Sequence, residues 1–161
     1  MTESSEKRIQ QAIDNFKEGY GCCQSVVAAF CDLYGLDRTM ALRVSAGFGG
    51  GVGRMRLICG AASALVILAG LHQGQTKGDD PAGKAECYKL VQQLLATFKE
   101  RNASIICSEL LGIAAQKKAA GDTTPEPDER NAEYYKVRPC ARMVASSARI
   151  FAEFLESQTT K

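Results

Sequence analysis

The sequence predicts an all-α fold, a single-domain helical bundle of 161 residues built around one buried central helix. Apolar residues recur at helical spacing in successive segments that glycine or proline delimits, and no run shows the strict alternation of a strand. Residues 57–72 are apolar on every side, which is typical of a helix enclosed by others. Hydrophobic residues make up 45% of the chain and charged residues 24%, which excludes a disordered or fibrous protein.

The first half of the chain is expected to form four helices. Glycines at positions 19 and 35 end the first two, and Asp37 is placed to cap the third. Five of the seven residues from 47 to 53 are glycine, so this segment is expected to be a tight loop rather than a helix. The expected helices are residues 3–17, 22–34, 37–46 and 57–72.

The second half is expected to contain further helices and one linker. Asp80 and Pro81 are typical of a helix start, and a helix is expected to follow them to residue 101. Residues 121–131 carry two prolines and several acidic side chains without an apolar period, which predicts a linker. The remaining expected helices are residues 104–111, a weaker stretch at 113–120, and 139–156.

Seven cysteines are the unusual feature of the composition, and four of them are expected at helix starts. The free N–H groups and the positive dipole end of a helix stabilise a thiolate, so the pKa of a thiol there falls below about 8.5. Arg54 and Arg56 precede one of these cysteines, and cations at a helix start are most favourable beside an anion. The sequence therefore predicts one shared site for Cys22, Cys59, Cys107 and Cys140.

A structural role for the cysteines is also open at this stage. Free cysteine is among the most buried residue types, and this interpretation suits Cys31 and Cys87, which lie deeper within expected helices. No CxxC occurs, so the spacing alone gives little support to a zinc or small iron–sulfur site. His72 is the single histidine and has no Asp or Glu pattern beside it, which disfavours a Cys-His-Asp protease.

Four motifs in order carry a family resemblance. They are GYGCCQSV at residues 19–26, the glycine loop leading to CGA at 59–61, CSELLG at 107–112, and Pro139-Cys140. With these motifs the chain resembles the C_GCAxxG_C_C family of redox-active proteins over about residues 8–155. The chain departs from the family pattern at Ala64, where the motif has glycine, and at Gly21, where asparagine is usual. The resemblance implies a redox or metal-related role for the four cysteines and names no substrate.

Three functions stay open from the sequence. The four cysteines form a site for a transition metal or an iron–sulfur cluster, or they carry out thiol–disulfide chemistry, with Cys59 as the favoured nucleophile. In either case the chain is an oxidoreductase or an electron-transfer accessory, with Arg54 and Arg56 as electrostatic support. The glycines expected to allow close backbone approach at the site are Gly49, Gly50 and Gly51. The third function is a non-catalytic helical adaptor or small-ligand-binding protein with structural cysteines.

Charge and hydropathy limit the expected partners. The net charge is +2, and the basic residues are interleaved with acidic ones, which disfavours nucleic-acid binding. The longest apolar stretch is interrupted by glycine and serine and falls short of the about 20 residues that span a bilayer. No secretory signal is recognisable at the start, so a cytoplasmic location is expected. A redox partner protein and a homodimer are the remaining partner hypotheses.

Overall fold

The computed structural model describes residues 1–161 and confirms the all-α class. Nine α-helices and one 3-10 turn follow one another without a strand. They are α1 (Glu3–Lys17), α2 (Cys22–Phe30), η1 (Cys31–Tyr34), α3 (Arg38–Ala46), α4 (Gly60–Gln73), α5 (Pro81–Asn102), α6 (Cys107–Ile113), α7 (Lys117–Gly121), α8 (Ala132–Val137) and α9 (Cys140–Thr159).

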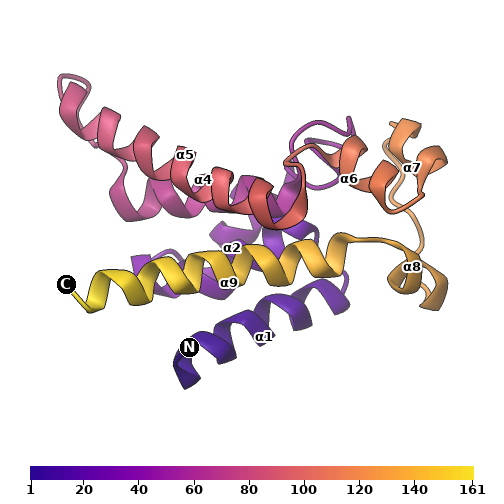
Figure 1. Ribbon diagram of the computed structural model, residues 1–161, viewed down its shortest axis with the longest axis horizontal. Coiled ribbons are helices and arrows are strands. Elements are labelled where there is room, and N and C mark those ends of the chain that lie inside the picture. Colours follow the sequence, from indigo (N-terminus) through magenta and orange to yellow (C-terminus); the bar gives the residue numbers. More distant parts are fainter.

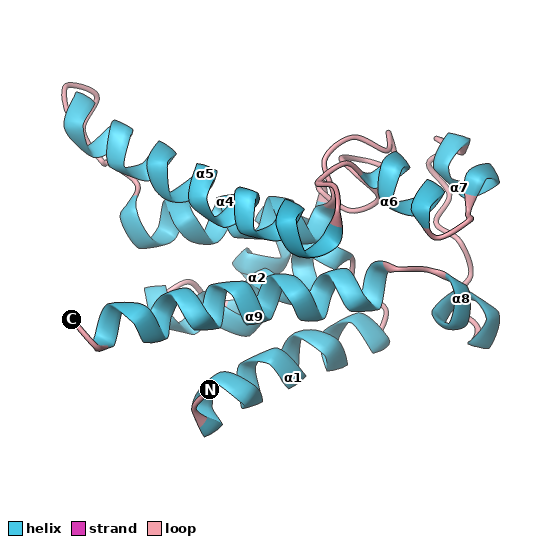
Figure 2. Ribbon diagram, viewed as in Figure 1, coloured by secondary structure: helices cyan, strands magenta, loops and turns pink.

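The long helices pack side by side, and the short ones gather at one end of the bundle. Helix α9 runs between α1 and the α4–α5 pair, both chain termini lie at one end, and α6, α7 and α8 lie at the other (Figure 1). Loops are concentrated near these three short helices (Figure 2). A single core cluster of 27 buried residues joins α1, α2, α4, α5 and α9.

Helix α4 corresponds to the expected central helix, and one side of it is fully buried. Its inner residues Ala61, Ala64, Leu65 and Leu68 are all fully buried. Small side chains at 61 and 64 allow neighbouring helices to approach, and the hydroxyl of Ser147 on α9 donates a hydrogen bond of 2.7 Å to the Ala61 carbonyl. The beginning of α4 is therefore fixed against α9.

Local capping chemistry accounts for several helix starts. The Asp37 carboxylate accepts a hydrogen bond from the Met40 N–H, and Asp80 caps the start of α5, where Pro81 is the first residue. At α2, the Gln24 side chain accepts from the Gly21 N–H at 2.9 Å. These are the starts at which expectation and structure agree most closely.

Other expectations need correction. The central helix begins at Gly60, three residues later than predicted, because residues 56–58 pair with the segment before α6. The expected 22–34 helix changes to a 3-10 turn at Cys31, and the stretch at 113–120 is helical only in α7. Helix α8 lies just beyond the segment predicted as a linker and was not predicted.

Candidate functional site

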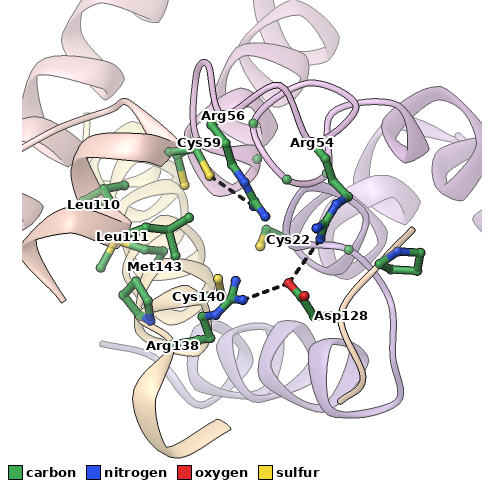
Figure 3. Close-up of a pocket in the computed structure, with 18 of the residues that line it drawn as sticks. Cys22, Arg54, Arg56, Cys59, Leu110, Leu111, Asp128, Arg138, Cys140 and Met143 are labelled. Atoms are coloured by element: carbon green, nitrogen blue, oxygen red, sulfur yellow. Dashed lines mark hydrogen bonds and ion pairs between the residues drawn. The ribbon is translucent and has the colours of Figure 1, made fainter. Parts of the chain in front are cut away.

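One cavity of about 220 Å³ lies where four helices begin, and its lining includes all four cysteines of the family motifs. Cys22 is the first residue of α2, Cys107 of α6 and Cys140 of α9, while Cys59 is the N-cap residue of α4. Segments 33 to 118 residues apart in sequence therefore present sulfur atoms to one space (Figure 3).

The start of α4 lies very close to the start of α2. A Cβ added at Gly60 would lie 3.0 Å from the Phe48 carbonyl oxygen, 3.1 Å from the Cys22 Cβ and 3.2 Å from the Cys23 N. A side chain here would push the two helix starts apart. This close approach of the two helix starts explains why the residue after Cys59 is glycine.

The glycine loop is left-handed along most of its length. Gly50, Gly51 and Gly53 have φ between 56° and 76°, and so do Val52 and Arg54. Positive φ is unusual for any residue with a side chain and strained for the β-branched Val52. Backbone hydrogen bonds within the segment hold this conformation, including Gly53 N–H to Gly47 O at 2.8 Å.

Gly51 positions the loop directly against Cys107. A Cβ at Gly51 would lie 2.6 Å from the Cys107 Cβ and 2.8 Å from the Leu57 N. The Cys107 N–H in turn donates to the Leu57 carbonyl at 2.6 Å, and the Cys59 N–H donates to the Ile105 carbonyl at 2.6 Å. These two bonds fix the chain around Cys59 relative to the chain around Cys107.

The five non-cysteine residues expected at the site all line the cavity, namely Gly49, Gly50, Gly51, Arg54 and Arg56. The two arginines, however, do not pair with Cys59. Arg54 forms ion pairs with Asp122 at 3.3 Å and Asp128 at 3.2 Å. Arg56 donates from Nε to the Asp122 carbonyl at 3.0 Å, and its Nη1 lies 3.9 Å from the Cys107 sulfur.

Residues 122–131, which belong to the segment 121–131 expected to be a linker, supply part of the wall. Asp128 lines the cavity and accepts from both Arg54 and Arg138, the latter at 2.8 Å. Arg130 also lines it, donating to the carbonyls of Phe16 and Tyr20. We refer to residues 122–131 as the strap.

Sequence reasoning did not identify Asp128, Arg130 or Tyr134 as residues of the site. The only available signal was the position of the strap directly before the last family motif. The Arg138 guanidinium lies 5.1 Å from the centre of the Tyr134 ring and pairs with Asp128, so it joins the strap to α8 at the cavity.

Cys140 has the most favourable surroundings for a thiolate. A hydrogen bond from the Cys22 thiol, one from the Tyr134 hydroxyl and the charges of Arg138 and Arg130 outweigh burial and lower the pKa of Cys140 to about 6. The same contact with Cys140, together with burial, raises the pKa of Cys22 well above its usual value. The two shifts have opposite directions because one thiol donates to the other, so the pair as a whole favours a single thiolate.

Cys59 differs from the expectation that it would be the nucleophile. It is 6% exposed, and burial raises its pKa to about 12 although the N–H groups of Ala62 and Ala61 oppose this. Burial also raises the pKa of Cys107, with Arg56 acting in the opposite direction. The local environment therefore favours Cys140 over Cys59 as the reactive thiolate.

The side chains around the cavity do not form a ready set of metal ligands. No group of three or more His, Cys, Asp or Glu side chains is arranged to hold one, and all seven cysteines are free thiols. Structural zinc takes four ligands at about 2.0–2.3 Å, so the sulfur atoms would have to move together before they could bind it. The arrangement does not fit a metal centre as it stands.

None of the helices combines the length and the apolar character that crossing a bilayer would need.

A family model described as "Putative redox-active protein (C_GCAxxG_C_C)" matches residues 20–154, a range that includes all four cavity cysteines. No curated protein and no solved structure gives a significant match.

Proposed function

Because the chain belongs to the C_GCAxxG_C_C family of redox-active proteins, we propose that it carries out dithiol–disulfide exchange with Cys140 as nucleophile and Cys22 as resolving thiol. One observation carries this proposal: these two family cysteines begin different helices and line the same cavity, where each thiol shifts the pKa of the other. Neither is fully buried, so a small substrate can reach them.

The chemistry balances with a disulfide as substrate. The Cys140 thiolate attacks one sulfur of the substrate, forming a mixed disulfide and releasing the other half as a thiolate. That thiolate takes the proton of Cys22, and the Cys22 thiolate attacks the Cys140 sulfur and releases the second half. Two electrons pass from the protein dithiol to the substrate, which leaves as one thiol and one thiolate that water protonates, and the protein retains a Cys22–Cys140 disulfide.

The geometry supports both halves of this step. At pH 7 a thiol with a pKa of about 6 is mostly ionised, whereas a free thiol is ionised to a few per cent. The resolving thiol lines the same cavity as its target, and the two sulfurs must approach to the bond length of about 2.05 Å for the disulfide to form. A redox partner protein or a small thiol would then restore the dithiol.

The metal or iron–sulfur hypothesis keeps one supporting observation, the presence of four thiols around one cavity. It requires Cys59 and Cys107 to approach the other pair. The adaptor hypothesis requires that the cavity thiols be replaceable without loss of function. The oxidation experiment described next distinguishes the dithiol, metal-centre and adaptor hypotheses.

The test is to oxidise the reduced protein with 2-hydroxyethyl disulfide, block free thiols and map the products by mass spectrometry. The expected product is a Cys22–Cys140 disulfide. The Cys22→Ser variant should accumulate a mixed disulfide on Cys140, and Cys140→Ser should form neither, while Cys87→Ser, outside the cavity, should behave as wild type.

Two results would overturn the proposal. One is a first mixed disulfide on Cys59 or Cys107 in the Cys22→Ser variant. The other is stoichiometric metal, bound after anaerobic purification and lost in every single-cysteine variant of the cavity, which would favour the metal centre.

A further inference from the structure

Arg56 is a buried cation with an unsatisfied hydrogen-bond donor. The residue is 6% exposed, its Nε is bonded to the Asp122 carbonyl, and its Nη1 has only the distant Cys107 sulfur. Its Nη2 is buried and has no hydrogen-bond partner. A charged donor left unpaired in this way is costly, and folded proteins rarely retain one without a reason.

The cavity around Arg56 has an excess of positive charge. Four arginines line it, against Asp128 as the one carboxylate. Arg54 and Arg138 share that carboxylate. Arg130 donates to backbone carbonyls and lies 4.2 Å from the centre of the Phe16 ring. Arg56 and Arg130 thus have no carboxylate partner, so the lining favours an anion even when Cys140 is ionised.

The guanidinium of Arg56 extends toward the same space that the sulfur atoms face (Figure 3). A group bound at Nη2 would therefore lie beside the dithiol. The cavity of about 220 Å³ is smaller than the 300–1,000 Å³ typical of sites for drug-sized ligands, which favours a compact molecule over a protein segment.

We propose that the substrate is a small disulfide that carries an oxyanion, carboxylate or phosphate, which the free Nη2 of Arg56 binds while the disulfide meets Cys140. This inference rests on the proposed function for the identity of the reactive group. The anion site itself rests on the orphaned donor and the charge of the lining, so it can be tested without any redox step.

The first experiment compares small disulfides of matched length. The reduced protein is oxidised by dithiodiglycolate, which is anionic, by 2-hydroxyethyl disulfide, which is neutral, and by cystamine, which is cationic. Arg56→Gln should lower the rate ratio of the anionic to the neutral disulfide by about tenfold, since a charge-assisted hydrogen bond is lost. Arg43→Gln, which removes an exposed charge on α3, should leave the ratio unchanged.

The same comparison in Cys107→Ala separates two roles for Arg56. If the arginine binds the substrate anion, the preference for dithiodiglycolate persists without Cys107. Loss of the preference in Cys107→Ala would show that Arg56 acts through that thiol and would overturn the proposal. An equal ratio in wild type and Arg56→Gln would overturn it as well.

A second experiment needs only the wild-type chain, so it holds even if Arg56→Gln fails to fold. Alkylation of reduced Cys140 by neutral iodoacetamide is followed at fixed ionic strength in inorganic phosphate, in glutarate and in chloride. Saturable protection by phosphate or by glutarate identifies which oxyanion the site takes. Equal rates in all three salts would overturn the anion site. Protection without a Cys22–Cys140 disulfide in the oxidation experiment would reject the proposed function alone.

Discussion

The helix-packed core and the cysteine cavity are built from the same helices but differ in side-chain packing, backbone conformation and hydrogen bonding. In the core, Phe30 and Phe151 are fully buried and meet edge to face at 5.1 Å. At the cavity, Arg54 has positive φ, Arg56 is buried with an orphaned nitrogen, and four thiols line one space. Cys22 and Cys23 illustrate the contrast, because the first lines the cavity and the second is fully buried in the core.

The contrast indicates where folding and function conflict. Residues in the core satisfy packing and helix propensity together, which is what a sequence needs to specify one structure. Backbone strain, buried charge and perturbed thiols each oppose stability, and they coincide at one place. A site that retains three unfavourable features together is better explained by chemistry than by packing.

The largest effect is expected in the core. Phe151→Ala should lower the free energy of unfolding by about 3–5 kcal/mol, since it removes a fully buried ring and leaves a cavity. Urea unfolding measures this cost, with Phe151→Leu as a milder companion. Below its unfolding midpoint the variant should retain the wild-type alkylation rate at Cys140. A large loss of that rate would break the proposed separation of the two regions.

Alanine substitutions at two glycines of the same loop test how much the close approach to Cys107 costs. Gly51→Ala should destabilise by more than about 2 kcal/mol, because the new Cβ would enter both a left-handed backbone and the space of Cys107. Gly53→Ala meets nothing within 4 Å and should cost only the conformational penalty of about 1 kcal/mol. Equal destabilisation in urea would show that close approach to Cys107 contributes nothing.

Much of the fold could be predicted because its signals are local. Asp37, Asp80 and Pro81 define helix starts through bonds and angles within a few residues, and the structure confirms them. The sequence also placed four cysteines at helix starts, where the structure has them. Such features depend on the neighbouring sequence alone.

The rest depends on long-range contacts. The late start of α4 follows from pairing between residues 56–58 and 105–108, which no local pattern encodes. The surroundings of Cys59 could not be predicted for the same reason: Arg54 and Arg56 are close to it in sequence, but Arg54 pairs with Asp122 and Asp128, and Arg56 donates to the Asp122 carbonyl. Burial of Cys59 and the contact of Tyr134 with Cys140 are likewise properties of the assembled bundle.

A smaller effect is expected when one donor to Cys140 is removed. Tyr134→Phe deletes a hydroxyl that favours the thiolate, so the pKa of Cys140 should rise by up to about one pH unit, or 1.4 kcal/mol. The pH midpoint of iodoacetamide alkylation should then move upward, and the rate at pH 6 should fall. Tyr135→Phe is the matched control, because its hydroxyl donates to the Lys17 carbonyl instead. An unchanged midpoint in Tyr134→Phe would contradict the assignment.

The smallest effect concerns the strap. Burial raises the pKa of Asp128, but hydrogen bonds from Arg54 and Arg138 outweigh it, so the carboxylate stays ionised at neutral pH and its ion pairs are lost as pH falls through the lowered pKa. Asp128→Asn removes this charge at every pH. Because the side chain is 33% exposed, the cost in stability should be below about 1 kcal/mol.

In Asp128→Asn, the alkylation midpoint of Cys140 should move in the opposite direction to its movement in Tyr134→Phe. With Arg138 no longer neutralised by Asp128, its charge acts more strongly on Cys140, so the alkylation midpoint should move to lower pH and the rate at pH 5 should rise severalfold. Glu129→Gln, an exposed change in the same strap, serves as the control. If both variants shift the midpoint equally, the effect comes from the net charge of the strap and not from the Asp128 ion pairs.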